Sequence, residues 1–154
     1  MPLLVGVDAG GTSINVVVER DRAVVDVFEG ESANVRRLGV DDAATIIGRA
    51  VASAAHGERI DALVVGAAGA GHPEIADGLR GALTAHFGGT PIVVTDDATI
   101  ALRAAVDGDG FVVIAGTGSI ACARVGDRMY RAFGAPCDIL TKFAQTAIPR
   151  IAGS

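Results

Sequence analysis

The chain has 154 residues, half of them hydrophobic and a fifth charged, with a formal net charge of −5. This length and composition fit one compact domain with a real core and exclude a disordered or fibrous protein. The acidic balance and the scarcity of aromatic residues, with no Trp and one Tyr, count against a nucleic-acid surface. A small-molecule partner is therefore expected.

The chain shows no segment typical of membrane or secreted proteins. Its longest apolar runs, such as residues 62–70, are too short to cross a bilayer, and the N-terminus has neither the basic start nor the cleavage site of a signal peptide. Cys122 and Cys137 lack metal-ligand spacing. A cytoplasmic location with reduced thiols is predicted.

Short apolar runs separated by turn residues predict three antiparallel strands at the N-terminus. The strands are expected at Leu3–Val7, Ile14–Val18 and Arg22–Phe28. A glycine turn, Gly10-Gly11-Thr12, joins the first two, and residues 30–39 are expected to form a polar loop.

Helices and strands alternate in the remainder of the chain. The predicted elements are a helix at Val40–Ala55, a strand at Ile60–Val65, a helix at Glu74–Phe87, a strand at Pro91–Thr95, a helix at Ala98–Val106, and strands at Phe111–Ala115, Ser119–Val125 and Met129–Ala132. This order predicts an α/β fold in which a mixed sheet has helices on both faces.

The first glycine turn could hold a phosphate. Glycine lets main-chain N–H groups approach an anion, and Thr12 adds a hydroxyl donor. Asp8, at the end of the preceding strand, could hold Mg²⁺ through water. The residues alone do not separate this interpretation from an ordinary hairpin turn beside a buried, capping Asp8.

A second turn, Gly116-Thr117-Gly118, repeats the same pattern near the other end of the chain. Two such hairpins facing each other could clamp a polyphosphate. The P-loop motif is absent, and the only lysine is Lys142. Residues 66–71 do not have the spacing of a dinucleotide fingerprint, so they form either a strand-to-helix connection or a substrate contact.

Asp96 and Asp97 stand where a predicted strand ends and a helix begins. Open α/β sheets bind ligands beyond the carboxyl ends of their strands. In phosphoryl transfer to an alcohol, a carboxylate there could accept the hydroxyl proton. Helix capping would explain one of the two acids, but it does not require both.

The segments VDAGGTS (residues 7–13), TDDA (95–98) and IAGTGSI (114–120), together with Asn34, resemble the N-acetylglucosamine kinase and BadF/BadG/BcrA/BcrD-type ATPase family. The resemblance covers about residues 3–132. It implies a ribonuclease-H-like lobe of the actin-like ATPase superfamily that phosphorylates an amino sugar with ATP and Mg²⁺.

The resemblance also implies roles for individual residues. Thr12 and Thr117, with Gly10, Gly11, Gly116 and Gly118, would lie near the ATP phosphates, and Asp8 near the metal. Asn34, Asp97, Ser119 and Ile120 would contact the sugar. Asp97 rather than Asp96 aligns with the catalytic base, because it keeps the distance to the second glycine turn.

The family pattern predicts three parts: a lobe at residues 1–108, the first strands of a second lobe at 109–132, and a divergent tail at 133–154. An amphipathic helix is expected within residues 138–151. With the second lobe incomplete, the isolated chain is expected to bind ligands weakly and to turn over slowly or not at all. A homodimer, or association with a complementary lobe, would complete it.

Two other functions stay open. One is an ATPase that activates a dehydratase and holds an iron–sulfur cluster between subunits through cysteines. The other is a non-catalytic sugar-binding regulatory module derived from a kinase.

Overall fold

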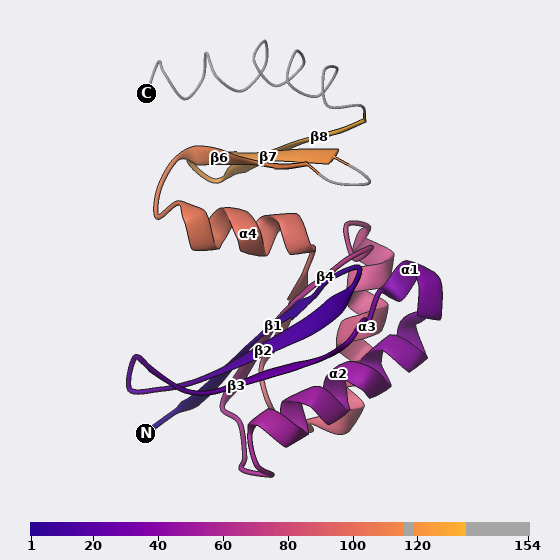
Figure 1. Cartoon of the computed structure of the whole chain (residues 1–154), viewed down its shortest axis with the longest axis vertical. Coiled ribbons are helices and arrows are strands. Elements are labelled where there is room, and N and C mark those ends of the chain that lie inside the picture. Colours follow the sequence, from indigo (N-terminus) through magenta and orange to yellow (C-terminus); the bar gives the residue numbers. More distant parts are fainter. Residues whose placement is uncertain (116–118, 135–154) are drawn as a thin grey trace. The chain divides into compact units, whose positions relative to one another are not determined.

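The computed structural model describes residues 1–115 and 119–134, and the chain divides into two units, Met1–Asp97 and Ala98–Ser154. Figure 1 gives the order of the elements along the chain. The second predicted glycine turn (residues 116–118), Cys137 and the predicted helix at 138–151 lie outside the described residues.

The first unit contains a five-stranded mixed sheet. Its strands are β1 (Leu3–Ala9), β2 (Ser13–Arg20), β3 (Ala23–Glu31), β4 (Ala62–Ala67) and β5 (Ile92–Thr95), in the order β3-β2-β1-β4-β5. The first three strands are antiparallel, whereas β4 pairs parallel with both β1 and β5. The predicted mixed sheet is confirmed.

Three helices accompany this sheet: α1 (Val35–Leu38), α2 (Val40–Ala54) and α3 (Pro73–His86). In α2 the buried residues recur at helical spacing, and Asp41 and Asp42 stand in the first turn, where negative charge suits the helix dipole. Pro73 begins α3, a position that needs no backbone N–H. The short helix α1 was not predicted, because residues 30–39 read as a loop.

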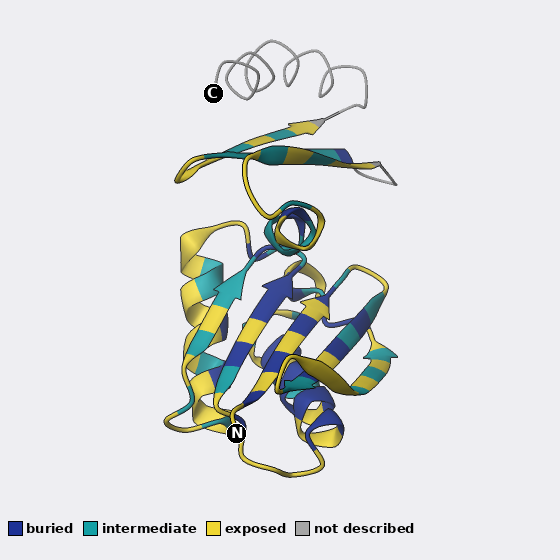
Figure 2. Cartoon of the chain, turned by 90° about the vertical axis from the view of Figure 1, so that its left-hand side faces the viewer, coloured by how far each residue is buried: buried dark blue, intermediate teal, exposed yellow. Residues whose placement is uncertain are grey.

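The core of this unit lies between one face of the sheet and the helices. Residues of β1, β2 and β4 alternate between buried and exposed, so that Val5, Val16 and Leu63 are buried against α2 and α3 while Leu4, Val17 and Val64 are exposed. Figure 2 shows this alternation along the strands. The mixed α/β class is confirmed, but within residues 1–97 the packed helices cover one face, whereas helices were expected on both. We call the other face the open face.

The second unit contains α4 (Asp97–Ala105, which begins at the last residue of the first unit) and the strands β6 (Gly110–Ala115), β7 (Ser119–Val125) and β8 (Arg128–Gly134). The strands form an antiparallel sheet in the order β6-β7-β8. Ala98 and Leu102 of α4 pack against Cys122 of β7. Among the helices of the described residues, none has both the length and the apolar character that a membrane span requires.

Candidate functional site

Polar residues meet at the carboxyl ends of the parallel strands. Asp8 of β1 lies opposite Gly66 of β4, and Gly66 lies opposite Thr95 of β5. Asp96 and Asp97 follow β5 directly. Since ligands of open α/β sheets bind beyond these strand ends, this edge is the candidate site.

The charge of Asp97 acts on Asp8 although 88 residues separate the two in the sequence. Partial burial raises the pKa of Asp8 above its ordinary value of 3.8, and the negative charge of Asp97 raises it further. Asp96 is buried, and its Oδ2 lies 3.5 Å from the Thr95 hydroxyl. The structure therefore distinguishes the two neighbouring acids. The charge of Asp97 raises the pKa of Asp8, whereas Asp96 is buried.

Asp8→Asn is expected to raise the free energy of unfolding at neutral pH. The raised pKa means that the folded chain binds the Asp8 proton more tightly than the unfolded chain does. Wild-type stability therefore falls as the pH rises from 3.8 through the folded pKa, whereas asparagine does not titrate. Urea unfolding across this pH range should show an advantage of the variant that disappears at acidic pH. An advantage that persists below pH 3.8 would contradict this explanation.

Ser32 organises the first glycine turn. Its hydroxyl lies 3.2 Å from the Gly10 carbonyl and 2.9 Å from the Gly11 carbonyl, and its Oγ accepts a bond from the Asn34 N–H at 3.4 Å. In a trans peptide the N–H points opposite to the carbonyl, and the described residues contain no cis peptide. The N–H groups of Gly11 and Thr12 therefore point away from Ser32, as donors to an anion would have to.

The sequence patterns did not predict a role for Ser32. The signal that could have found it is the length of β3, which continues to Glu31 opposite Ser13 and so brings the next residue against the turn. A buried hydroxyl needs a hydrogen-bond partner, and the two turn carbonyls supply it.

Asn34 is the N-cap of α1. Its Oδ1 accepts a hydrogen bond from the Arg36 N–H at 3.0 Å. Its Nδ2 faces the glycine turn, 3.9 Å from the point where a Cβ on Gly11 would lie. The amide oxygen is thus used by the helix, and the NH₂ group is the part of the side chain that can reach a ligand.

Comparing Asn34→Ser with Asn34→Ala should separate these two roles. Serine keeps an oxygen cap and removes the NH₂ donor, so its stability should stay close to wild type, while alanine should cost about 1 kcal/mol. Both variants should weaken sugar binding, measured by calorimetry. Full sugar affinity in Asn34→Ser would exclude the NH₂ group as a ligand contact.

Residues 66–72, which include the end of β4, form hydrogen bonds with the end of β1 and the start of α1. The Ala68 N–H donates to the Ala9 carbonyl at 2.9 Å, and the Ala68 carbonyl accepts from the Val35 N–H at 3.3 Å. Gly69 has φ +95°, and a Cβ there would clash with Cγ of Arg36. These contacts connect β4, β1 and α1 and account for the glycine at position 69.

The remaining predicted site residues belong to the second unit. Ser119 is buried at the start of β7. The Ile120 side chain packs with the cluster that contains Leu102 and Cys122, so it is used in the core of that unit. Gly116, Thr117 and Gly118 are outside the described residues, and the pairing of the two glycine turns stays a prediction.

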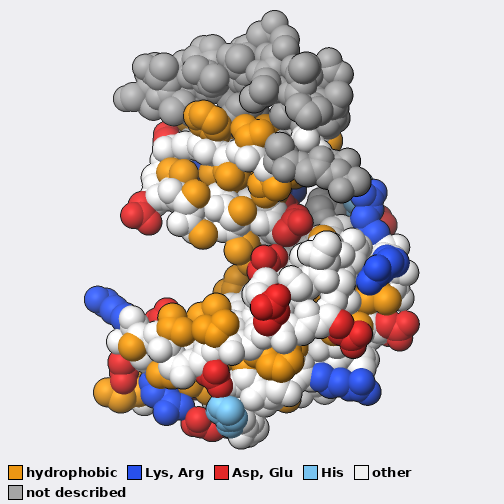
Figure 3. Space-filling view, viewed as in Figure 1, with side chains coloured by type: hydrophobic (Ala, Val, Ile, Leu, Met, Phe, Trp, Pro, Cys, Tyr) orange, Lys and Arg blue, Asp and Glu red, His pale blue; other side chains and the backbone are white. Residues whose placement is uncertain are grey.

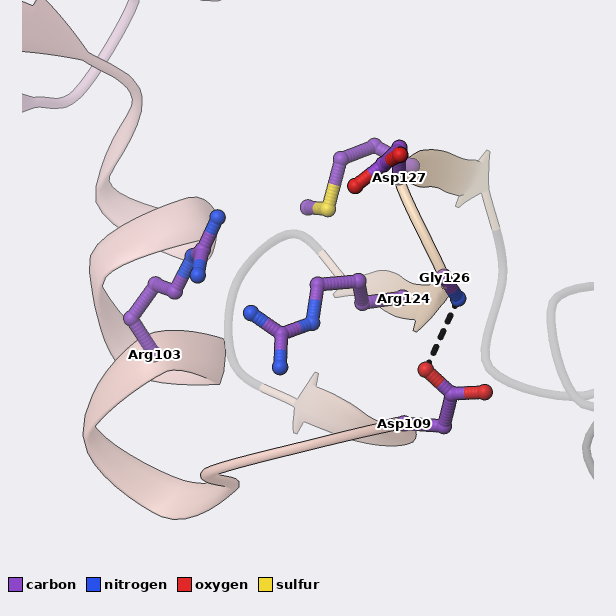
Figure 4. A pocket seen from close by; sticks show the side chains of 6 residues that line it. Arg103, Asp109, Arg124, Gly126 and Asp127 are labelled. Carbon is purple, nitrogen blue, oxygen red and sulfur yellow. Dashed lines mark hydrogen bonds between the residues drawn. The ribbon is translucent and has the colours of Figure 1, made fainter.

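A hollow of about 390 Å³ in the second unit is lined by Arg103, Asp109, Arg124, Gly126, Asp127 and Met129 (Figure 4). The Arg124 guanidinium donates to the carbonyls of Asp107 and Gly108, and Asp109 accepts from the Gly126 N–H at 2.8 Å. These polar groups fix the connections beside β6 and β7. The hollow contains none of the predicted site residues.

The described residues contain no group of three or more His, Cys, Asp and Glu side chains placed to hold a metal. Mg²⁺ does not need one, because it keeps several waters and binds through one or two carboxylates. The negative charge of Asp97 makes ionisation of Asp8 more costly, and a cation bound there would relieve that cost, so Asp8 and Asp97 are a fitting donor set for a hard cation. Cys122 is fully buried among apolar side chains, which does not suit a cluster ligand shared between subunits.

Solved structures share this fold. A protein assigned as an N-acetylglucosamine kinase from Porphyromonas gingivalis has a TM-score of 0.71 and 24% identity, covering 86% of this chain and 48% of its own. One from Chromobacterium violaceum has a TM-score of 0.68 and 20% identity, covering 89% and 51%. A ROK family glucokinase from Streptomyces griseus, in complex with glucose and AMPPNP, has a TM-score of 0.59 and 24% identity, covering 87% and 48%. The chain spans about half the length of these structures, and the likeness confirms the predicted actin-like ATPase fold.

The family comparison covers more of the chain than any single motif does. No curated protein matches the chain. The model of the BadF/BadG/BcrA/BcrD ATPase family matches residues 5–135, which include the first glycine turn, both acids after β5 and the strands β6 to β8. The chain therefore belongs to the BadF/BadG/BcrA/BcrD ATPase family.

Proposed function

We propose that this chain carries the phosphate- and sugar-binding part of an ATP-dependent kinase for an amino sugar such as N-acetylglucosamine. The observation that carries the proposal is the position of Asp8 and Asp97 at the carboxyl ends of β1 and β5, where the charge of Asp97 raises the pKa of Asp8, beside a glycine turn whose carbonyls are held by Ser32. The structural likeness to sugar kinases supports the same reaction class.

Asp97 is the proposed general base. In the transfer, an oxygen of the sugar forms a bond to the γ-phosphorus while the bond from that phosphorus to the β–γ bridging oxygen breaks, and ADP leaves. The hydroxyl proton passes to the Asp97 carboxylate. A carboxylate at the start of a helix, anchored directly after β5, is positioned by rigid backbone rather than by a loop.

The first glycine turn is the proposed phosphate contact. The N–H groups of Gly11 and Thr12, with the Thr12 hydroxyl, would donate to phosphate oxygens. Gly116, Thr117 and Gly118 would add a second set of donors. Asp8 would hold Mg²⁺ through water, and the ion would supply positive charge against the phosphates.

Asn34 is the proposed sugar contact of the first unit, through its Nδ2. Ser119 and Ile120 are kept as sugar contacts on the family resemblance alone. We also keep the cytoplasmic location and the homodimer, or the association with a complementary lobe, as proposals.

Calorimetric titration of the chain with N-acetylglucosamine and glucose, each with and without Mg²⁺–AMPPNP, tests the proposal. We expect saturable binding that favours the amino sugar, depends on Asp97 and tightens with nucleotide. Sugar-dependent ADP release measures the transfer itself. Sugar binding that ignores nucleotide and Asp97 would instead favour the non-catalytic module.

A further inference from the structure

The hollow in the second unit collects charged side chains from separate segments of the chain. Arg103 comes from α4, Asp109 from the connection before β6, and Arg124 from the end of β7. Leu102 of α4 packs against Cys122 of β7. Because Arg124 lies two residues beyond Cys122, its side chain leaves the sheet on the face that α4 covers. Figure 4 shows Arg103 and Arg124 directed into the same space, one from the helix and one from the strand.

The Arg124 guanidinium is held in place by backbone carbonyls. Its Nε and Nη2 donate to the Gly108 carbonyl at 3.0 and 2.7 Å, and Nη2 also donates to the Asp107 carbonyl at 2.9 Å. These contacts use one edge of the planar group and leave Nη1 as a donor for another acceptor. An arginine that is fixed in this way loses little side-chain freedom when it binds an anion.

The acidic groups of the hollow do not pair with the two guanidiniums. Asp109 accepts the Gly126 N–H at 2.8 Å, which fixes the turn between β7 and β8. In the part of the second unit that the structure describes, the side chains of Arg103 and Asp127 form no ion pair or hydrogen bond. Two like charges directed into one space repel each other, and an anion between them relieves that repulsion. The hollow therefore offers two guanidinium groups and one unused carboxylate.

This pair of guanidiniums is a local feature of the second unit. On the face of that unit that Figure 3 shows, hydrophobic side chains prevail over charged ones. Arg131 donates to the Thr99 hydroxyl at 2.7 Å, so it is used within the fold. Arg128 is exposed and lies outside the hollow. A general basic surface does not explain why Arg103 and Arg124 converge.

We propose that this hollow binds a polyol phosphate, such as a phosphorylated sugar, with the phosphate between Arg103 and Arg124 and a hydroxyl group donating to Asp127. Arginine suits phosphate oxygens because its planar fork donates two parallel hydrogen bonds. A carboxylate repels a bare phosphate, whereas it accepts a hydrogen bond from a hydroxyl of the same ligand. The volume of about 390 Å³ is ample for such a molecule. The hollow contains none of the residues proposed for the kinase reaction, so the inference does not rest on that function.

Calorimetric titration of the full chain with glucose 6-phosphate and with inorganic phosphate, both without nucleotide, tests the proposal. Glucose 6-phosphate should bind saturably and more tightly than phosphate, and added salt should weaken both. Arg103→Gln should reduce both affinities by roughly tenfold and leave the thermal unfolding midpoint unchanged, because the side chain is exposed. Arg128→Gln removes the same charge outside the hollow and is the matched control, which should bind like the wild type.

Asp127→Asn separates the two parts of the ligand. Loss of the carboxylate should tighten the binding of inorganic phosphate and reduce the preference for glucose 6-phosphate, since a repelling charge and a hydroxyl acceptor are removed together. An unchanged preference would reject a polyol phosphate as the ligand.

Three results would overturn the site itself. They are the absence of saturable binding to the wild type, equal losses in Arg103→Gln and Arg128→Gln, and binding that depends on Asp97 instead of Arg103. The last result would place glucose 6-phosphate at the candidate site of the proposed kinase. Binding that depends on Arg103 would support the hollow whatever the ADP assay shows, so the two proposals fail separately.

Discussion

Asp97→Asn, in a chain completed by a second copy or a complementary lobe, is expected to lower sugar-dependent ADP release by about 10²- to 10⁴-fold, the range that a positioned general base contributes. Asparagine has nearly the same shape but cannot accept the hydroxyl proton, so sugar affinity should fall much less than turnover. The proposed role rests on Asp97 being the acid that shares the electrostatic environment of Asp8. A coupled assay for ADP, together with calorimetry for sugar binding, measures both quantities.

Asp96→Asn is the matched comparison. Asp96 is 6% exposed and lies next to Asp97, so the two substitutions change the same chemical group one position apart. If Asp96 has a structural role, its replacement should lower stability and leave the turnover of the folded fraction close to wild type. A loss of turnover in Asp96→Asn with retained turnover in Asp97→Asn would reverse the assignment.

Leu63→Ala is expected to lower the free energy of unfolding by about 3 kcal/mol. Leu63 is fully buried in β4, in the centre of the sheet and against the helices, so its truncation leaves a cavity that the packed surroundings cannot fill. Val64→Ala, the next residue on the same strand, is the control: its side chain is 42% exposed and should cost less than about 1 kcal/mol. Urea unfolding of both variants measures the difference, and equal losses would contradict the one-sided core.

Much of the fold could be predicted because its signals are local. Short apolar runs and glycine turns identified the strands of both hairpins, and helical spacing identified α2, α3 and α4, with ends within two residues of the observed ones. Helix α1 was missed because four residues are too few to show a period. Its start depends on Asn34 capping the Arg36 N–H, a contact that also occurs in ordinary turns.

The candidate site could be predicted only in part. Gly10, Gly11, Thr12, Asp8 and Asp97 carry recognisable patterns, but the choice between Asp96 and Asp97 came from the family resemblance. The structure separates them by burial, which depends on how β5 ends and α4 begins. Ser32 belongs to no short motif, because its partners are backbone carbonyls more than twenty residues away.

The sequence by itself determined the strands, the principal helices, the mixed sheet and the residue types of the site, since periodicity and turn chemistry act over a few residues. Only the tertiary structure decided which distant groups meet, such as Asp8 with Asp97, and which sheet face stays open. Apolar runs such as Leu63-Val64-Val65 predict burial on both faces of a strand. Whether helices cover a given face of the sheet depends on the elements that pack on that face, so the sequence of one strand cannot determine it.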